Sequence, residues 1–321
     1  MGGDLGPRST LPAAINFATR HPHVHLSLIG LPSALPSVSP KPNITLIPVD
    51  DVVTMDDRPA AALRNRQGSS MWKAVSMVAN HEADACVSAG NTGALMAMGK
   101  FLLKTFPGID RPAICKLIPG EPNDCVMLDL GANIECTSEQ LLQFAVMGSV
   151  LAADDDALER PRVALLNVGK EASKGREQVR LAATLLQDSE HLRYVGFIEG
   201  DGIFRGEADV VVCDGFTGNV ALKASEGTAT LLADQLKRFF ESTPWWRLIG
   251  YFARPLLLKW HTRFDPARYN GASFLGLQGT VIKSHGGADS EGFECALSVA
   301  LDQAQRQLPQ RINQRIAQYL T

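Results

Sequence analysis

The segment "ADACVSAGNTGALMA" (83–97) changes character at its glycines. Its first half is mostly small and apolar, as in a buried strand, and its second half has the apolar spacing of a helix. Gly90, Asn91 and Gly93 lie between the two patterns. A strand that ends in glycine and leads into a helix is the repeating unit of α/β proteins, and its turn presents backbone N–H groups to an anion. We therefore expect an α/β fold that holds an anion at this turn.

The same alternation of strand and helix continues along the rest of the chain. Strands are predicted at residues 24–30, 44–49, 83–89, 113–118, 125–130, 162–168, 194–199, 208–214 and 279–284. Helices are predicted at residues 9–20, 68–80, 92–105, 138–152, 173–187, 219–240 and 291–308. This order predicts a mostly parallel sheet covered by helices on both faces, in one α/β/α domain that spans residues 1–321.

The composition is that of a globular protein with a large core. The chain has 321 residues, of which 45% are hydrophobic and 20% are charged. Its net charge of −3 gives no support for nucleic-acid binding, and we expect no nucleic-acid partner. No apolar stretch reaches the ~18 residues of a membrane-spanning helix. The six cysteines form no C-x-x-C pair and are expected to be buried thiols in a reducing cytosol.

Four of the predicted strands end in loops rich in glycine and asparagine. The loops are "VSAGNTG" (87–93), "LDLGAN" (128–133), "LLNVGKEASKG" (165–175) and "VCDGFTGN" (212–219). Because ligands of open α/β sheets bind at the carboxyl ends of the strands, we expect the four loops to converge on one crevice. The predicted phosphate- or substrate-binding residues in and beside it are Ser88, Gly90, Asn91, Thr92, Gly93, Asn133, Thr217, Gly218 and His285.

These loops lack the signatures of the common nucleotide and hydrolase sites. No G-x-G-x-x-G follows a strand, no P-loop motif is present, and no serine lies in a G-x-S-x-G turn. Cysteines and histidines do not cluster at the spacing of a zinc site. We therefore expect neither a cofactor nor a metal.

The loops instead offer the donors that an anionic nucleophile requires. Phosphate needs little activation, but it must be held in place while the oxyanion on the attacked carbonyl is stabilised. Lys174 is the predicted charge that clamps phosphate or the oxyanion, and Asn219 is the predicted uncharged donor. Three structural roles stay open: a solvated lysine for Lys174, a helix N-cap for Asn219 and a strand-end cap for His285.

A second unusual segment, "LKRFFESTPWWRLIGYFARPLLLKWHTRF" (236–264), combines aromatic, apolar and basic residues. It contains three of the four tryptophans, and its six Lys and Arg residues face a single acid, Glu241. This composition is typical of an amphipathic element at a membrane surface, and a basic surface also suits an acidic protein. A helical hairpin in a dimer interface is the alternative. The residues expected at the membrane or partner-protein contact are Trp245, Trp246, Arg247, Ile249, Phe252, Arg254 and Lys259.

Six motifs occur in order, at plausible spacing, over nearly the whole chain. They are "MGGDLGP" (1–7), "SAGNTGALMA" (88–97), "LDLGANIEC" (128–136), "LLNVGKEASKG" (165–175), "VCDGFTGNVALK" (212–223) and "YNGASFLGLQGTVIKSHG" (269–286). Together they resemble the acyl-ACP:phosphate acyltransferases, the PlsX family. The resemblance implies an isopropylmalate-dehydrogenase-like α/β/α fold that is related to phosphotransacetylases.

The resemblance also implies a bacterial enzyme of phospholipid synthesis. Such enzymes transfer a long acyl chain from acyl carrier protein to inorganic phosphate, which gives free carrier protein and acyl phosphate for glycerol-3-phosphate acylation. The family's lysine in the K-G turn and its asparagine in the G-F-T-G-N turn are thought to be catalytic. They fall on Lys174 and Asn219.

The resemblance further implies where such an enzyme works and with which partners. It implies a homodimer in the cytoplasm, peripherally bound to the inner face of the cell membrane through a helical protrusion at residues 229–269. The implied partners are acyl carrier protein, inorganic phosphate, the membrane surface and the downstream glycerol-3-phosphate acyltransferase.

Two other functions are considered beside this one. A phosphotransacetylase that acts on short acyl-CoA needs no membrane tip, so segment 236–264 speaks against it. A non-catalytic scaffold that binds acyl carrier protein at the membrane has no use for the Lys174 and Asn219 turns.

One departure from the family lies at the beginning of the sequence. In the family a hydrophobic strand that ends in Asp precedes the M-G-G-D motif, whereas Met1 starts inside that motif here. We therefore expect a strand near the centre of the sheet to be missing, through a mis-assigned start codon or a shortened chain.

Overall fold

The computed structural model describes residues 1–35, 41–153, 160–264 and 268–319, with the backbone alone at 257–264 and 319. Its strands are β1 (Leu26–Gly30), β2 (Ile44–Pro48), β3 (Ala85–Ser88), β4 (Ala113–Ile118), β5 (Cys125–Leu128), β6 (Arg162–Leu166), β7 (Arg193–Ile198), β8 (Val210–Val212), β9 (Ala272–Leu275) and β10 (Thr280–Lys283). Its helices are α1 (Pro7–Arg20), α2 (Pro59–Asn65), α3 (Ser70–Ala79), α4 (Thr92–Leu102), α5 (Ser138–Ala152), α6 (Glu177–Gln187), α7 (Gly215–Glu241), α8 (Pro244–Phe264), α9 (Ser290–Gln305) and α10 (Leu308–Tyr319), with a 3-10 turn at Pro32–Ala34.

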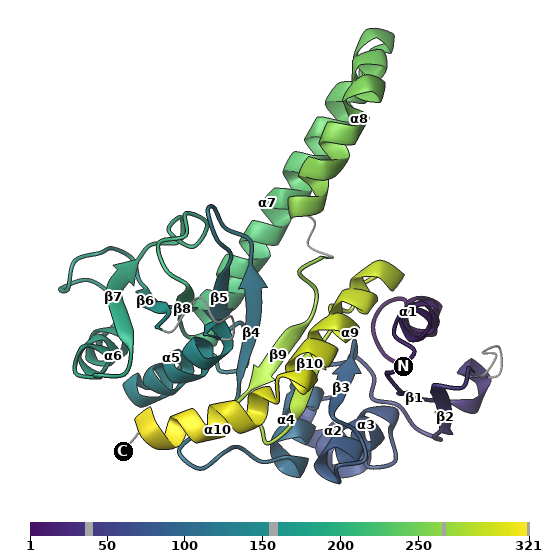
Figure 1. Ribbon diagram of the computed structural model, residues 1–321, viewed down its shortest axis with the longest axis horizontal. Helices are drawn as coiled ribbons and strands as arrows, with labels where there is room; N and C mark the ends of the chain where they lie inside the picture. Colours follow the sequence, from purple (N-terminus) through teal and green to yellow (C-terminus); the bar gives the residue numbers. More distant parts are fainter. Residues whose placement is uncertain (36–40, 154–159, 265–267, 320–321) are drawn as a thin grey trace.

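These elements form three layers around one central sheet (Figure 1). The sheet has the strand order β3-β10-β9-β4-β5-β8-β6-β7 among the described residues. Helices α3, α4 and α7 pack against one face around a core that includes Val75, Met98 and Leu222. Helices α5, α6 and α10 pack against the other face around Phe144, Leu186 and Ile312. The predicted α/β/α fold is confirmed.

The sheet is mostly parallel, but it reverses direction at its centre. The pairs β3–β10, β5–β8, β8–β6 and β6–β7 are parallel, whereas β10–β9, β9–β4 and β4–β5 are antiparallel. The carboxyl ends of β5, β6 and β8 therefore lie at one edge of the sheet, by which we mean the side where strands begin or end and not an outer strand. The carboxyl ends of β3 and β10 lie at the opposite edge. The expectation that all four glycine-rich loops share one edge is wrong, because it assumed that all the strands run the same way.

All the predicted strands form, and most helix boundaries agree with the prediction to within a few residues. Strand β9 was not predicted, because "ASFL" is too short to show an alternating pattern. The predicted helix 291–308 forms as α9 but ends earlier, at Gln305, and a separate helix that was not predicted, α10, begins at Leu308. Helix α7 begins earlier than predicted: Asp214 is its N-cap, so the N-cap alternative for Asn219 is wrong.

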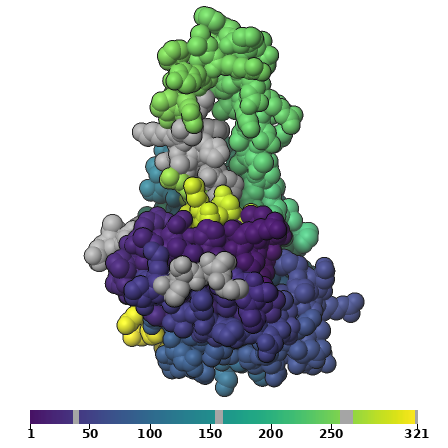
Figure 2. Space-filling model, turned by 90° about the vertical axis from the view of Figure 1, so that its right-hand side faces the viewer, coloured from purple at the N-terminus to yellow at the C-terminus, as the bar shows by residue number. Residues whose placement is uncertain are grey.

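Helices α7 and α8 form a hairpin that projects from the body of the molecule (Figures 1 and 2). Helix α7 has 27 residues, so it is roughly 40 Å long. Its first half packs on the sheet and its second half continues beyond it. Near the turn of the hairpin, the rings of Phe239 on α7 and Trp246 on α8 have centroids 4.7 Å apart.

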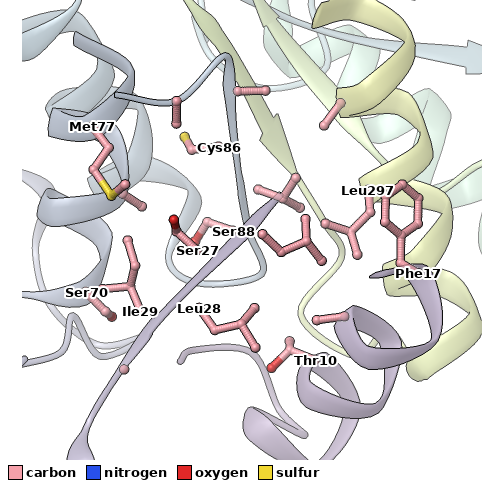
Figure 3. Close-up of a pocket in the computed structure, with 18 of the residues that line it drawn as sticks. Thr10, Phe17, Ser27, Leu28, Ile29, Ser70, Met77, Cys86, Ser88 and Leu297 are labelled. Carbon is pink, nitrogen blue, oxygen red and sulfur yellow. The ribbon is translucent and has the colours of Figure 1, made fainter. Parts of the chain in front are cut away.

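The short β1–β2 pair lies beside β3 and is separated from it by a cavity of about 540 Å³ (Figure 3). Consecutive residues of both strands line this cavity, from His25 to Gly30 and from Glu82 to Ala89. Helix α3 contributes Met77 to its wall, and α1 and α9 contribute Phe17 and Leu297. Within the described residues, the edges of β1 and β3 that face the cavity have no strand partner.

The first residue of the chain lies at one end of this cavity. Met1 lines it, and burial lowers the pKa of the Met1 amino group. A Cβ atom at Gly30, the last residue of β1, would lie 3.1 Å from Cγ of Met1, and one at Gly2 would lie 2.8 Å from Cα of Gly90, just after β3. A strand that leads into Met1 would therefore run parallel to β1 and β3 and could pair with both.

Supplying such a strand is predicted to stabilise the protein. We expect that about six β-branched apolar residues followed by Asp, fused before Met1, raise the melting temperature by several degrees. Burial of each Val or Ile side chain stabilises the folded state by ~1.5–3 kcal/mol, whereas ordering the backbone of each residue costs ~1–2 kcal/mol. Each kcal/mol of net stabilisation raises the melting temperature by roughly 2–4 °C. Differential scanning calorimetry measures the shift. A Gly/Ser extension of equal length is the control, and equal melting temperatures for both extensions would contradict the prediction.

Candidate active site

The beginning of α7 is pressed against the turn that follows β5. A Cβ atom at Gly218 would lie 1.9 Å from the carbonyl oxygen of Asp129, and one at Gly215 would lie 2.5 Å from that of Asn133. The carboxylate of Asp129 fixes this turn, because it accepts hydrogen bonds from the N–H groups of Ile114, Ala132 and Asn133. Both glycines are therefore required for the helix to reach the turn.

This packing places Asn219 next to the turn that follows β5. The Cβ atom of Asn219 lies 3.5 Å from the position that a Cβ at Gly131 would take, and Gly131 has a φ of 121°, which favours glycine. Asn219 is exposed, and its amide forms no hydrogen bond within the described residues. Its side chain is therefore available as a donor at the edge where β5, β6 and β8 end.

Lys174 lies at the same edge, on the loop between β6 and α6. The amide of Asn167 donates to the carbonyl oxygens of Gly169 and Lys174, at 3.2 and 3.1 Å, and so fixes the loop. The ammonium of Lys174 is 2.9 Å from a carboxylate oxygen of Glu171, and this hydrogen bond raises the pKa of the exposed lysine. Lys174 thus keeps its charge but shares it with Glu171 in this structure.

Three lysines and a histidine, one of them on α7 and the others on or after neighbouring strands, form what we call the basic cluster. Glu226, about two turns after Asn219, accepts hydrogen bonds from Lys116 on β4 at 3.0 Å and from Lys223 at 2.8 Å. The remaining members are Lys283, on β10, and His285, just after it. The basic cluster is therefore Lys116, Lys223, Lys283 and His285.

The members of the basic cluster alter each other's proton affinity. Burial and the charge of Lys223 lower the pKa of Lys283 to about 8. Partial burial and the charges of Lys223, Lys283 and Lys116 lower the pKa of His285, although much of its ring is accessible. An anion at this place would find several positive charges and a neutral imidazole.

The sequence prediction found only His285 of the basic cluster. Lys116 and Lys283 lie in the strand runs "AICKLI" (113–118) and "GTVIKS" (279–284), and the sequence prediction gave neither lysine a role. A lysine within an otherwise apolar strand is the signal that could have identified both. Lys223 lies on the same face of α7 as Asn219, four residues later, and the helical spacing could have identified it.

The six sequence motifs separate into two groups in space. The beginning of the chain, the loop after β3 and the loop after β10 meet at one edge of the sheet. There the N–H of Asp4 donates to the carbonyl oxygen of Gly286 at 2.8 Å, and Gly2 packs against Gly90. The other three motifs meet at the opposite edge, around the beginning of α7. Helix α7 connects the two groups because it carries both Asn219 and Lys223, whose charge reaches His285.

Three of the predicted binding side chains have internal partners. Asn91 accepts from the N–H of Ala94 and donates to carbonyl oxygens of residues 55 and 57, so it caps α4. Asn133 is buried and donates to Pro112 and Asp129, and the hydroxyl of Thr217 donates to Asp214. The hydrogen bonds of Asn91, Asn133 and Thr217 therefore stabilise the loops of the candidate site.

The loop after β3 holds four more predicted binding residues, at the edge opposite Lys174. The hydroxyl of Ser88 accepts from the N–H of Gly90 at 3.2 Å, and Thr92 is the first residue of α4. A Cβ atom at Gly90 would lie 2.8 Å from Cε of Met71, and one at Gly93 would lie 2.7 Å from the ring of Pro59. Close packing thus accounts for both glycines.

The residues predicted to contact a membrane lie on the projecting hairpin. Trp245 and Phe252 are 67% and 74% exposed, and Arg247 and Arg254 are also exposed. Trp246 and Ile249 are partly buried, so they face the hairpin more than solvent. The side chain of Lys259 lies outside the described residues. Among the described helices, none combines the length and apolarity needed to cross a bilayer.

Known proteins with similar structures share this architecture at low sequence identity. A phosphotransacetylase from Streptococcus pyogenes matches with a TM-score of 0.57 at 18% identity, over 93% of this chain and 92% of its own. The EutD phosphotransacetylase from Staphylococcus aureus matches with a TM-score of 0.52 at 16% identity, over 92% and 99% of the two chains. These similarities show that the fold is that of the phosphotransacetylases.

Comparison of sequences is more specific. The family model described as fatty acid synthesis protein matches residues 1–311. A phosphate acyltransferase from Pseudomonas fluorescens is 51% identical over 100% of this chain and 97% of its own, and one from Alcanivorax borkumensis is 51% identical over 99% and 96%. The resemblance seen in the motifs is thereby confirmed over the full length. The chain belongs to this family of fatty acid synthesis proteins, the phosphate acyltransferases or PlsX family, and is an acyltransferase.

Proposed function

We propose that this enzyme transfers a long acyl chain from acyl carrier protein to inorganic phosphate. A phosphate oxygen attacks the thioester carbonyl carbon, the C–O bond forms, and the C–S bond breaks. The carrier leaves as a thiolate that takes a proton from water. The acyl phosphate, a reactive mixed anhydride, would then supply glycerol-3-phosphate acylation at the inner face of the cell membrane. The observation that supports this proposal is that one helix, α7, carries both Asn219 and Lys223, a member of the basic cluster. The loop that holds Lys174 reaches the beginning of the same helix, where Arg176 lies 3.5 Å from Asp214.

The proposed roles follow from the charge of each group. The amide of Asn219 would donate to the oxyanion that forms on the thioester carbonyl. The ammonium of Lys174 would turn from Glu171 to the phosphate, or to the same oxyanion. Lys283 and Lys223 would balance the negative charge of the phosphate and hold it for attack. No side chain needs to act as a covalent nucleophile.

The reaction is tested by release of free carrier thiol from palmitoyl-ACP, with and without phosphate. We expect release that depends on phosphate. Equal release without phosphate would indicate a thioesterase, and the absence of release would favour a non-catalytic scaffold. Release from acetyl-CoA in preference to palmitoyl-ACP would favour the phosphotransacetylase alternative.

Replacement of either predicted catalytic residue is expected to reduce turnover strongly. Lys174→Ala and Asn219→Ala should each lower kcat/KM by roughly 10²-fold or more, because each removes one preorganised donor. The thiol-release assay measures this, and thermal unfolding checks the fold. Lys170→Ala is a matched control on the same loop, where the Lys170 ammonium pairs with Glu207 at 2.7 Å. A Lys174 or Asn219 variant with nearly the wild-type rate would remove that residue from the mechanism.

The partly buried Lys283 predicts a pH dependence of phosphate binding. With its pKa lowered to about 8, Lys283 is charged at neutral pH and loses its proton as the pH rises through about 8. Phosphate itself changes from partly to almost fully dianionic over this range, so KM is expressed for the dianion, and this KM should rise roughly fivefold by about pH 9, as for the loss of a charge worth ~1 kcal/mol. Lys283→Arg, which stays protonated, should flatten the profile. A constant KM in the wild type would exclude Lys283 from phosphate binding.

We also propose that the α7–α8 hairpin binds the surface of an anionic membrane. Trp245, Tyr251 and Phe252 are 67%, 70% and 74% exposed near its tip, and the neighbouring Arg247 and Arg254 would add attraction of ~1 kcal/mol each at an anionic leaflet. Exposed arginines would equally suit the acidic surface of a carrier protein. The apolar sides of the hairpin would suit a second copy of this chain, as in a homodimer.

The membrane proposal predicts that binding and catalysis can be separated. The triple variant Trp245→Glu, Tyr251→Glu, Phe252→Glu should lose co-sedimentation with anionic vesicles and keep transfer from soluble palmitoyl-ACP. Phe101→Glu, on α4 and 59% exposed, is the control for a charge placed on an apolar surface. If the triple variant still sediments with vesicles but its mass by light scattering falls by half, the tip is a dimer contact instead.

A further inference from the structure

A second cavity, of about 170 Å³, lies beneath α7 and against β4. Its wall is made mainly of apolar side chains from three parts of the fold. Leu117 and Ile118 come from β4, Ile203 and Phe204 come from the loop before β8, and Leu222 comes from α7. The ion pair between Lys116 and Glu226, at 3.0 Å, also lines the cavity and joins it to the basic cluster.

The cavity exists because α7 carries small residues on this side. Ala221, Ser225 and Ala229 all line it, and their spacing of four residues places them on one face of the helix. The hydroxyl of Ser225 donates to the carbonyl oxygen of Ala221 at 2.7 Å, so it does not offer its proton to the cavity. The helical side of the cavity is thus narrow, smooth and without a free donor.

The cavity follows α7 away from Asn219. Leu222, which lines the near part of the cavity, lies three residues after Asn219 on an adjoining face of the helix, and Ala229 lies ten residues after Asn219, roughly 15 Å along the helix axis. A thioester carbonyl held at the Asn219 amide would therefore have the near end of the cavity beside it. A chain attached to that carbonyl could run along the helix past the Lys116–Glu226 pair.

We infer that this cavity holds the first part of the donor's hydrocarbon chain, and that Ala221, Ser225 and Ala229 set how much of the chain it accepts. This inference rests on the proposed function. An apolar cavity of ~150 Å³ stays dry and takes up a six-carbon ring from water. A cavity of about 170 Å³ therefore has room for a similar number of carbon atoms of an acyl chain. The rest of a long chain would pass Leu232, which is 56% exposed on the projecting part of α7.

The larger cavity of about 540 Å³ is not a suitable site for the chain, although it is also mostly apolar. Backbone groups of β1 and β3 line it along strand edges that have no strand partner within the described residues. A hydrocarbon cannot form hydrogen bonds with these N–H and C=O groups, whereas a peptide strand can. The cavity under α7 has no such edges along its helical side.

Filling the cavity should change chain-length preference and leave phosphate use unaffected. We expect Ala229→Leu to lower kcat/KM for palmitoyl-ACP by roughly tenfold or more, which corresponds to the loss of room for about two methylene groups. Octanoyl-ACP should react within about twofold of the wild-type rate, and KM for phosphate should not change. Ala224→Leu is the matched control, because Ala224 lies on the same helix and is exposed. Both changes replace one good helix former with another.

The outcomes separate this inference from the proposed function. Without phosphate-dependent thiol release by the wild type, the proposed function fails, and the inference with it. If the wild type is active but Ala229→Leu has the same ratio of octanoyl to palmitoyl rates, the inference alone is overturned. An equal loss with both donors also overturns it, because that pattern indicates displacement of α7. A selective loss with palmitoyl-ACP that the Ala224→Leu control does not share supports it.

Discussion

The contact between the first turn of α7 and the turn after β5 determines most of what this molecule can do. At Gly218 the helix lies so close to the carbonyl oxygen of Asp129 that a Cβ atom would be 1.9 Å from it. Asp129 in turn is held by three backbone N–H groups. This contact fixes the position of α7, and α7 carries Asn219, Lys223, the small residues over the apolar cavity and half of the hairpin. A bulkier residue at Gly218 would move all of these features together.

The reversal of the sheet explains why a helix is needed, in addition to loops, to bring the residues of the candidate site together. In a fully parallel sheet, all strand-end loops would meet at one edge. Here β9 and β4 reverse the direction, so the loops after β3 and β10 are at one edge and the loops after β5, β6 and β8 are at the other. Only an element that crosses the face of the sheet can bring residues from both edges together. Helix α7 does so, and the basic cluster lies where it passes β4.

The sequence predicted the elements well and their arrangement less well. Strands such as "CVMLDL" and "RVALLNV" were evident because four or more apolar residues follow one another between turn residues. The direction of a strand depends on pairing with segments far away in the chain, as in the pairing of β4 with β9, and no local pattern reports it. The same limit applies to the site. Lys174 and Asn219 could be predicted as candidates because loop motifs contain them, whereas Lys116 and Lys283 become neighbours of α7 only through tertiary packing.

One further consequence follows from the length of α7. The helix is continuous for 27 residues, from Gly215, four residues before Asn219, to Glu241 at the turn of the hairpin, without an internal proline. Its first half lies on the sheet at the candidate active site, and its second half lies outside the body of the protein (Figure 1). A displacement of the hairpin would therefore act on the candidate site through the hydrogen-bonded backbone of one helix. The hairpin and the candidate active site are thus joined by one continuous helix, while the exposed side chains at the tip can be changed without altering that helix.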